Sequence, residues 1–294
     1  AMTGMWGRPW WPRWARVFSL FGAVLIGYNQ VFKLDGRELA VWRVLGILPV
    51  AGLSWWWLPW PTDVMFYVIS AGLGLGAVIG DILLMNASAK YGGRLASVYV
   101  PMKMLLAFCL WGAVAPESLQ PLFAEPWRLA VVAVCFGLAA WGMNHIRRND
   151  VSLKAMLAVV PVASSFAAAD VIEKYVLPAP TADPMEVVGA SMAMLSVLIG
   201  VGALPALLWL KGWPRWNTRT VLASAGFGFI LMVGISLLLV TFVLAPNPGY
   251  VAAITCLSTV WLSLWGRYVH GETGSAVALL MIVAAAVGVA LVGA

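Results

Sequence analysis

The stretch DVMFYVISAGLGLGAVIGDILLM occupies residues 63–85, and after its first residue Asp81 is its only charged side chain. About 20 apolar residues in a helix cross the hydrocarbon core of a bilayer, so this stretch predicts one crossing. Nine further apolar runs of similar length fill the chain on both sides of it, with short breaks between them. The predicted crossings are residues 15–32, 40–58, 63–85, 94–114, 128–143, 151–176, 186–210, 219–243, 250–269 and 274–292.

The composition of the whole chain agrees with a polytopic membrane protein. Of its 294 residues, 62% are hydrophobic and 10% are charged, and the mean hydropathy is +0.91. Backbone polar groups cannot stay unpaired in hydrocarbon, so each crossing is expected to be helical. We therefore predict an all-α membrane protein with ten transmembrane helices in the bacterial inner (plasma) membrane, preceded by a basic and aromatic segment at residues 1–14.

A short sequence repeat suggests an internal symmetry. The tripeptide LWG at residues 110–112 recurs at residues 264–266, in the fourth and ninth predicted spans. Five is an odd number of helices, so the second half would enter the membrane in the opposite orientation. This is the inverted-repeat plan of many secondary transporters, which places a substrate site near the bilayer midplane. We expect two five-helix repeats, residues 15–146 and 147–294, around a central cavity.

Three charged side chains stand out because they lie away from the ends of predicted spans. Lys103 is near the middle of the fourth span, Asp81 in the last third of the third, and Asp170 in the later half of the sixth. A charge at the bilayer centre costs about 2.5–3.5 kcal/mol on insertion scales. Such groups persist only when they are paired, hydrated or used by the protein.

Two interpretations of these charges stay open from the sequence. In the first, Lys103 forms a permanent ion pair with Asp81 or Asp170 and holds helices together. In the second, Lys103 lines a wet cavity and attracts a carboxylate or phosphate of the substrate. Asp81 or Asp170 would then bind the amine of the substrate or a coupling proton.

Four neighbouring residues complete the candidate substrate site. Tyr99 lies one helical turn before Lys103 and shares its face. Asn29 and Gln30 end the first span, where each can bind a ligand or a neighbouring helix. Pro101 interrupts the backbone hydrogen bonds of the fourth span, which makes it a kink or a hinge.

Within residues 63–85, Gly72, Gly74, Gly76 and Gly80 predict a small-residue face. Gly76 and Gly80 are four residues apart, a spacing that permits close approach of another helix. The strand-turn-helix context of a dinucleotide site is missing, so we expect packing rather than phosphate binding.

Several other chemistries have no sequence signal. The chain has no Walker motif, no G-x-S-x-G and no H-E-x-x-H, and His145 and His270 do not stand at metal-ligand spacing. We expect no enzyme activity, no cofactor and no metal. The net charge of +6 is spread over predicted loops, with Arg43 counted among these loop charges, so no nucleic-acid partner is expected. Three buried free thiols are expected, at Cys109, Cys135 and Cys256.

Several short segments resemble the drug/metabolite transporter superfamily, in its ten-helix EamA-type branch. They are GYNQVFK at residues 27–33, AVWR at 40–43, the loop and proline at 91–101, and the last two spans at 252–292. The resemblance implies two inverted five-helix halves with spans five and ten at the periphery. It also implies termini in the cytoplasm, whereas the distribution of Lys and Arg over the loops favours termini outside.

The functional expectation is a secondary transporter that moves a small polar metabolite by alternating access. Within the resemblance, export of an amino acid with an aromatic or hydrophobic side chain is the first choice. A carrier of an anionic sugar phosphate or nucleotide sugar is the alternative. A non-transporting membrane scaffold or lipid-processing protein is the alternative from another class. The expected partners are a small-molecule substrate, the lipid bilayer and a coupling proton.

Overall fold

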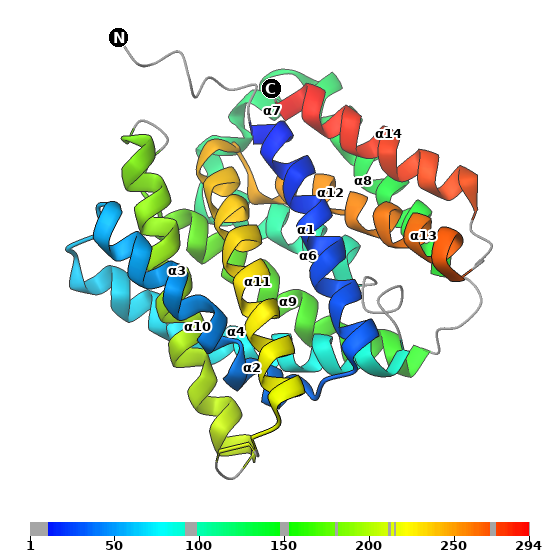
Figure 1. The fold of residues 1–294 in the computed structure, drawn as a ribbon. Helices are drawn as coiled ribbons and strands as arrows, with labels where there is room; N and C mark the ends of the chain where they lie inside the picture. Colours follow the sequence, from blue (N-terminus) through cyan, green and yellow to red (C-terminus); the bar gives the residue numbers. More distant parts are fainter. Residues whose placement is uncertain are drawn as a thin grey trace. The chain divides into compact units, whose positions relative to one another are not determined.

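The computed structural model describes residues 11–91, 99–147, 153–179, 182–210, 213–214, 216–270 and 275–293. Every regular element in these residues is a helix, and none is a strand (Figure 1). This confirms the predicted all-α class. The helices are α1 (Trp11–Phe32), α2 (Gly36–Trp42), α3 (Val44–Trp57), α4 (Val64–Tyr91), α6 (Tyr99–Val114), η2 (Pro116–Leu119), α7 (Gln120–Ala124), α8 (Pro126–Arg147), α9 (Leu153–Val176), α10 (Pro184–Leu210), α11 (Thr218–Leu244), α12 (Pro248–Thr255), α13 (Leu257–His270) and α14 (Ala276–Gly293).

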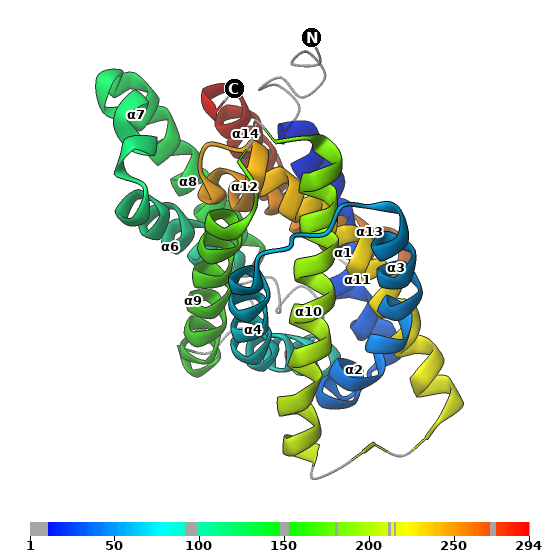
Figure 2. The same ribbon diagram turned by 90° about the vertical axis from the view of Figure 1, so that its left-hand side faces the viewer.

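Seven helical segments of the described chain are long and apolar enough to cross a membrane. These segments are α1, α2 with α3, α4, α8, α10, α11, and α12 with α13. An eighth is obtained if α6 and the short helices after it count as one span, although the chain bends by 117° between them (Figure 2). The protein is therefore a multi-pass helical membrane protein, while ten crossings and an inverted repeat stay predictions.

Two of these spans are interrupted within their length. The second is broken at Arg43, whose carbonyl accepts a hydrogen bond from the Gly46 amide at 3.1 Å, and α2 and α3 lie on either side. A later span is broken at Cys256, between α12 and α13. At a break the backbone departs from regular helix geometry, so the residues there are candidates for function.

The chain divides into two compact units, and each draws on both halves of the sequence. Unit 1 consists of residues 1–23, 97–171 and 244–294, and unit 2 of residues 24–96 and 172–243. Helices α6, α8, α12, α13 and α14 belong to unit 1, and helices α2, α3, α4 and α10 belong to unit 2. Helix α9 belongs to unit 1 up to residue 171, and α11 belongs to unit 2 up to residue 243.

In unit 2, α10 packs along α4, α2 and α3. The backbones of α4 and α10 approach closely at Gly74, where a Cβ atom would overlap the Leu198 carbonyl. In return, a Cβ at Gly202 of α10 would lie 2.9 Å from the Gly74 carbonyl oxygen. The predicted small-residue face thus serves helix packing, but its contact residue is Gly74. The expectation for Gly76 was wrong, because the space around it is open.

A second reciprocal crossing in unit 2 joins the α2–α3 break to α11. A Cβ at Gly228 would overlap the Arg43 carbonyl, and a Cβ at Gly46 would overlap the Ala225 carbonyl. Each glycine therefore meets the backbone of the other segment. Contacts of this kind stabilise helix pairs in a membrane, where apolar burial cannot hold helices together.

Unit 1 is built around two helix pairs, α8 with α14 and α6 with α12. Figure 1 shows α14 running beside α8. A Cβ at Gly142 of α8 would lie 2.9 Å from the Ala278 carbonyl oxygen of α14. Gly249 of α12 meets Phe108 of α6 just as closely, and the Phe108 and Tyr250 rings lie 5.8 Å apart. The helix contacts of this unit therefore use both small residues and aromatic rings.

Replacing Gly228 with alanine should destabilise the protein, because the added methyl group has no room beside the Arg43 carbonyl. Overpacking costs about 1–3 kcal/mol. The matched control is Gly200→Ala, since no atom of the described residues lies within 4 Å of a Cβ at that position. Thermal unfolding in detergent should show a lower Tm for Gly228→Ala and an unchanged or slightly higher Tm for Gly200→Ala. Equal Tm values for the two variants would contradict this packing.

Candidate functional site

The central ion pair of unit 1 joins Lys103 of α6 to Asp170 of α9. The Lys103 Nζ atom lies 2.8 Å from Asp170 Oδ2, and the side chains are only 14% and 5% exposed. Of the two partners that the sequence left open for Lys103, the structure selects Asp170. A buried pair of this kind is strongly destabilised when one partner is removed, by about 3–5 kcal/mol, because a buried charge is then left alone.

Two side chains of α9, Asp170 and Phe166, lie beside the Lys103 ammonium group. Phe166 lies one turn before Asp170, and the Lys103 Nζ atom is 5.8 Å from the centroid of its ring. An aromatic face at this distance attracts a cation. Farther along α6, Trp111 packs in a buried cluster with Val171 of α9. The two helices therefore hold Lys103 between a carboxylate and an aromatic ring.

A second ion pair lies in unit 2, between Arg43 and Asp81. Arg43 Nη1 donates to Asp81 Oδ2 at 2.8 Å, with the arginine side chain 2% exposed and the aspartate 24%. Arg43 stands at the break between α2 and α3, and Asp81 stands on α4, which packs against α2. Asp81 is thus bound to an arginine of its own unit.

Arg43 is the residue of this site that sequence reasoning missed. It was counted among the loop charges because it stands near the start of a predicted span. The signal that could have found it was available, since residues 40–58 form one apolar run and Arg43 lies inside it. Its burial follows from the break at this residue and from the close contact of its carbonyl with Gly228.

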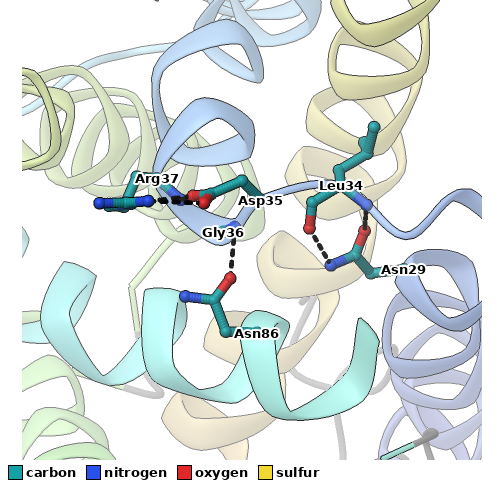
Figure 3. Close-up of polar contacts among 6 residues, drawn as sticks. All are labelled: Asn29, Leu34, Asp35, Gly36, Arg37 and Asn86. Atoms are coloured by element: carbon teal, nitrogen blue, oxygen red, sulfur yellow. Dashed lines mark hydrogen bonds and ion pairs between the residues drawn. The ribbon is translucent and has the colours of Figure 1, made fainter. Parts of the chain in front are cut away.

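Asn29 is fully buried at the end of α1, where it organises the turn into α2. Its Oδ1 accepts from the Leu34 amide at 2.9 Å, and its Nδ2 donates to the carbonyls of Leu34 and Met85, each at 3.0 Å. Figure 3 shows the two bonds to Leu34. The turn also holds Lys33 at a φ of 52°, a left-handed conformation that is unusual outside glycine. These bonds match the helix-joining role that the sequence allowed for Asn29.

The start of α2 is fixed by two further side chains (Figure 3). Asp35 is the N-cap, because its carboxylate accepts from the Arg37 amide at 2.8 Å and also binds the Arg37 guanidinium. Asn86 Oδ1 of α4 accepts from the Gly36 amide at 2.7 Å. The hydrogen bond from the Arg37 side chain holds the pKa of Asp35 below its ordinary value, although partial burial opposes this.

The remaining predicted site residues are placed less fully. Gln30 is half-buried near the end of α1. Tyr99 and Pro101 lie in the first turn of α6 as described, and their side chains fall outside the described residues. The kink or hinge expected at Pro101 is therefore untested. The expectation of three buried thiols was wrong at Cys109, which is exposed, whereas Cys135 and Cys256 are buried.

Lys174, at the last turn of α9, has a structural role in unit 2. Its Nζ donates to the Phe242 carbonyl at 2.5 Å, close to the end of α11. The last four carbonyls of a helix have no partner within it, and a lysine beside them satisfies one and complements the helix dipole.

The Asp35 cap predicts a pH-dependent contribution to stability. Its pKa is lowered from 3.8 in the folded protein, so the contribution is complete above that value and is lost as pH falls through the lower folded pKa. Losing a capping side chain costs about 0.5–2 kcal/mol. In thermal unfolding, Asp35→Ala should lie below the unmodified protein at neutral pH, with the difference shrinking below about pH 4.

Asp35→Asn is the control for this experiment. Asparagine keeps a capping oxygen but loses the ion pair with Arg37, so it should retain most of the stability at neutral pH. A difference between Asp35→Ala and the unmodified protein that stays constant down to about pH 3 would contradict the assigned role of the carboxylate.

No protein-family model matches this sequence, and no curated protein matches it. The functional argument therefore depends on the membrane helices and on the two buried ion pairs.

Proposed function

We propose that this chain is a secondary transporter that moves a small polar metabolite across the membrane by alternating access. The observation that carries the proposal is the ion pair between Lys103 and Asp170, buried among apolar helices of unit 1. A multi-pass protein that only needed stable helix contacts could use apolar and small residues there, because ionisable groups in the membrane are costly to insert. Intramembrane charges of this kind mark substrate and ion pathways in transporters.

The similarity of two helix crossings supports the inverted-repeat plan. In an inverted repeat of five spans, the third span corresponds to the eighth and the seventh corresponds to the second. The contact between the third and seventh spans should therefore resemble the contact between the eighth and second spans. The first pair is α4 with α10, and the second is α11 with the segment α2–α3. Both crossings consist of two glycines, each facing a carbonyl of the partner, with Gly74 and Gly202 in one and Gly46 and Gly228 in the other.

The resemblance to the EamA-type transporters places the fifth span, α8, at the periphery and the ninth span, α12–α13, on the path. Of the residues in the most apolar stretch of each segment, 33% are buried in α8 and 72% in α12–α13. This difference within unit 1 suits the placement, although α1 and α2–α3, at 39% each, are buried about as little as α8.

A zwitterionic substrate suits a site that contains both a cation and a carboxylate. The substrate carboxylate would replace Asp170 at the Lys103 ammonium, and the freed Asp170 would take the substrate amine or a proton. The Phe166 ring beside Lys103 would favour an aromatic or hydrophobic side chain, in keeping with amino acid export. A transport rate independent of pH would remove the coupling proton from this scheme.

The test is uptake and counterflow in proteoliposomes with labelled amino acids, sugar phosphates and nucleotide sugars. The unmodified protein should show saturable flux of one class. Lys103→Ala should lose both flux and stability, because it leaves Asp170 buried and alone. The double variant Lys103→Met with Asp170→Asn should recover stability and still carry at least about tenfold less flux, since both charges are gone.

The matched control removes an exposed ion pair of the same unit. Arg128 and Glu125 lie 2.9 Å apart with side chains about a third or more exposed, and replacing both with glutamine should leave flux unchanged. Full flux in the Lys103→Met, Asp170→Asn variant would reduce the buried pair to a structural contact. Absence of flux for every class in the unmodified protein would favour the scaffold or lipid-processing alternative.

A further inference from the structure

The buried guanidinium of Arg43 in unit 2 uses only part of its hydrogen-bonding capacity. Its Nη1 donates to Asp81, whereas Nε and Nη2 have no hydrogen-bond partner among the described residues. A guanidinium is planar, and Nε–H and one Nη2–H point in parallel from the same edge. Arg43 therefore holds Asp81 with one nitrogen, while its two-donor edge is buried, at 2% exposure of the side chain, without a hydrogen-bond partner among the described residues.

The Nε–Nη2 edge of a guanidinium has the geometry that binds oxyanions. Two parallel N–H donors match two oxygens of a carboxylate or a phosphate, which is the bidentate pairing that arginine forms best. Buried donors of a charged group are costly when no acceptor meets them. We propose that the Nε–Nη2 edge of Arg43 is a binding site for an oxyanion, the carboxylate or phosphate group of a ligand.

The surroundings fix Arg43 before any ligand arrives. Its carbonyl is in close contact with α11 at Gly228, which sets the position of the backbone. Helix α2, which ends at Arg43, packs on α4 through a buried cluster that includes Val41 and Ile82. Since Asp81 precedes Ile82 on α4, the same contact fixes the carboxylate that orients the guanidinium. A preorganised donor pair loses little freedom on binding.

Asp81 acts in this site as a positioning residue. It holds Nη1 and balances the charge of Arg43, which lets the arginine stay buried without a ligand. The same negative charge repels an arriving oxyanion, so removing it should strengthen binding. If Arg43 binds a ligand, changing Arg43 should weaken binding and removing the charge of Asp81 should strengthen it. A contact that only stabilises the fold would not show these opposite effects.

The inference goes beyond the proposed transport, because it concerns equilibrium binding in unit 2 and does not involve Lys103 or Asp170. The oxyanion can belong to a soluble molecule or to a lipid headgroup. Binding is therefore measured on the purified full chain in nanodiscs, as the rise of Tm with ligand concentration. One arm uses phosphatidylcholine discs with sodium benzoate or inorganic phosphate, compared with chloride at equal ionic strength. The other arm uses discs containing phosphatidylglycerol without added anion.

In at least one arm the unmodified protein should show a saturable rise in Tm. Arg43→Lys keeps the positive charge but has no parallel donor pair, so it should weaken the apparent affinity at least about tenfold. Asp81→Asn keeps the whole guanidinium and should bind more tightly than the unmodified protein. Arg37→Lys is the matched control, because this arginine pairs with the half-buried Asp35 and not with Asp81, and it should leave the response unchanged.

Two results would overturn the proposal. No saturable rise of Tm in either arm would mean that water fills the edge. An equal rise in Arg43→Lys and in the unmodified protein would place the anion elsewhere. If Arg43→Lys does not fold, the Asp81→Asn variant decides, since unchanged or weaker binding there contradicts a ligand edge on Arg43. A response confined to one arm identifies the source of the oxyanion.

Discussion

An ion in hydrocarbon needs a polar partner within hydrogen-bond distance, and Lys103 and Arg43 each have a carboxylate there. Lys103 of α6 lies against Asp170 of α9, and Arg43 lies against Asp81 of α4. Because neither aspartate is on the same helix as its cation, each pair also determines which helices must lie together within its unit. An exchange of partner at either pair, by a substrate or a proton, would therefore act directly on helix contacts.

Close approach of backbones is the second constraint, and it links packing to the ion pairs. The Arg43 side chain is buried because the α2–α3 break is in contact with α11 at Gly46 and Gly228. At these crossings the backbones approach so closely that an added methyl group has no room. The packing of glycines therefore fixes where the buried guanidinium begins.

The sequence predicted the helices well and their neighbours poorly. Residues 186–210 and 219–243 agree with α10 (Pro184–Leu210) and α11 (Thr218–Leu244) within two residues, because long apolar runs and flanking polar residues mark helix ends. Apolar periodicity carries no information about which helices meet, so the partner of Lys103 was left open between Asp81 and Asp170. Arg43 was missed for a related reason, because a charge near a span end is ordinarily solvated. Choosing Gly74 over Gly76 likewise required the position of α10.

Alternating access requires that the Lys103–Asp170 pair lies on a route that opens to water. The most direct test places a cysteine at Phe166, beside the pair, with the native thiols replaced by alanine, and treats proteoliposomes with a membrane-impermeant thiol reagent. A protein that keeps only the buried Cys135 is the unlabelled reference. The account predicts labelling at position 166 from each side of the membrane in separate experiments. Failure to label from either side, with the variant folded, would contradict it.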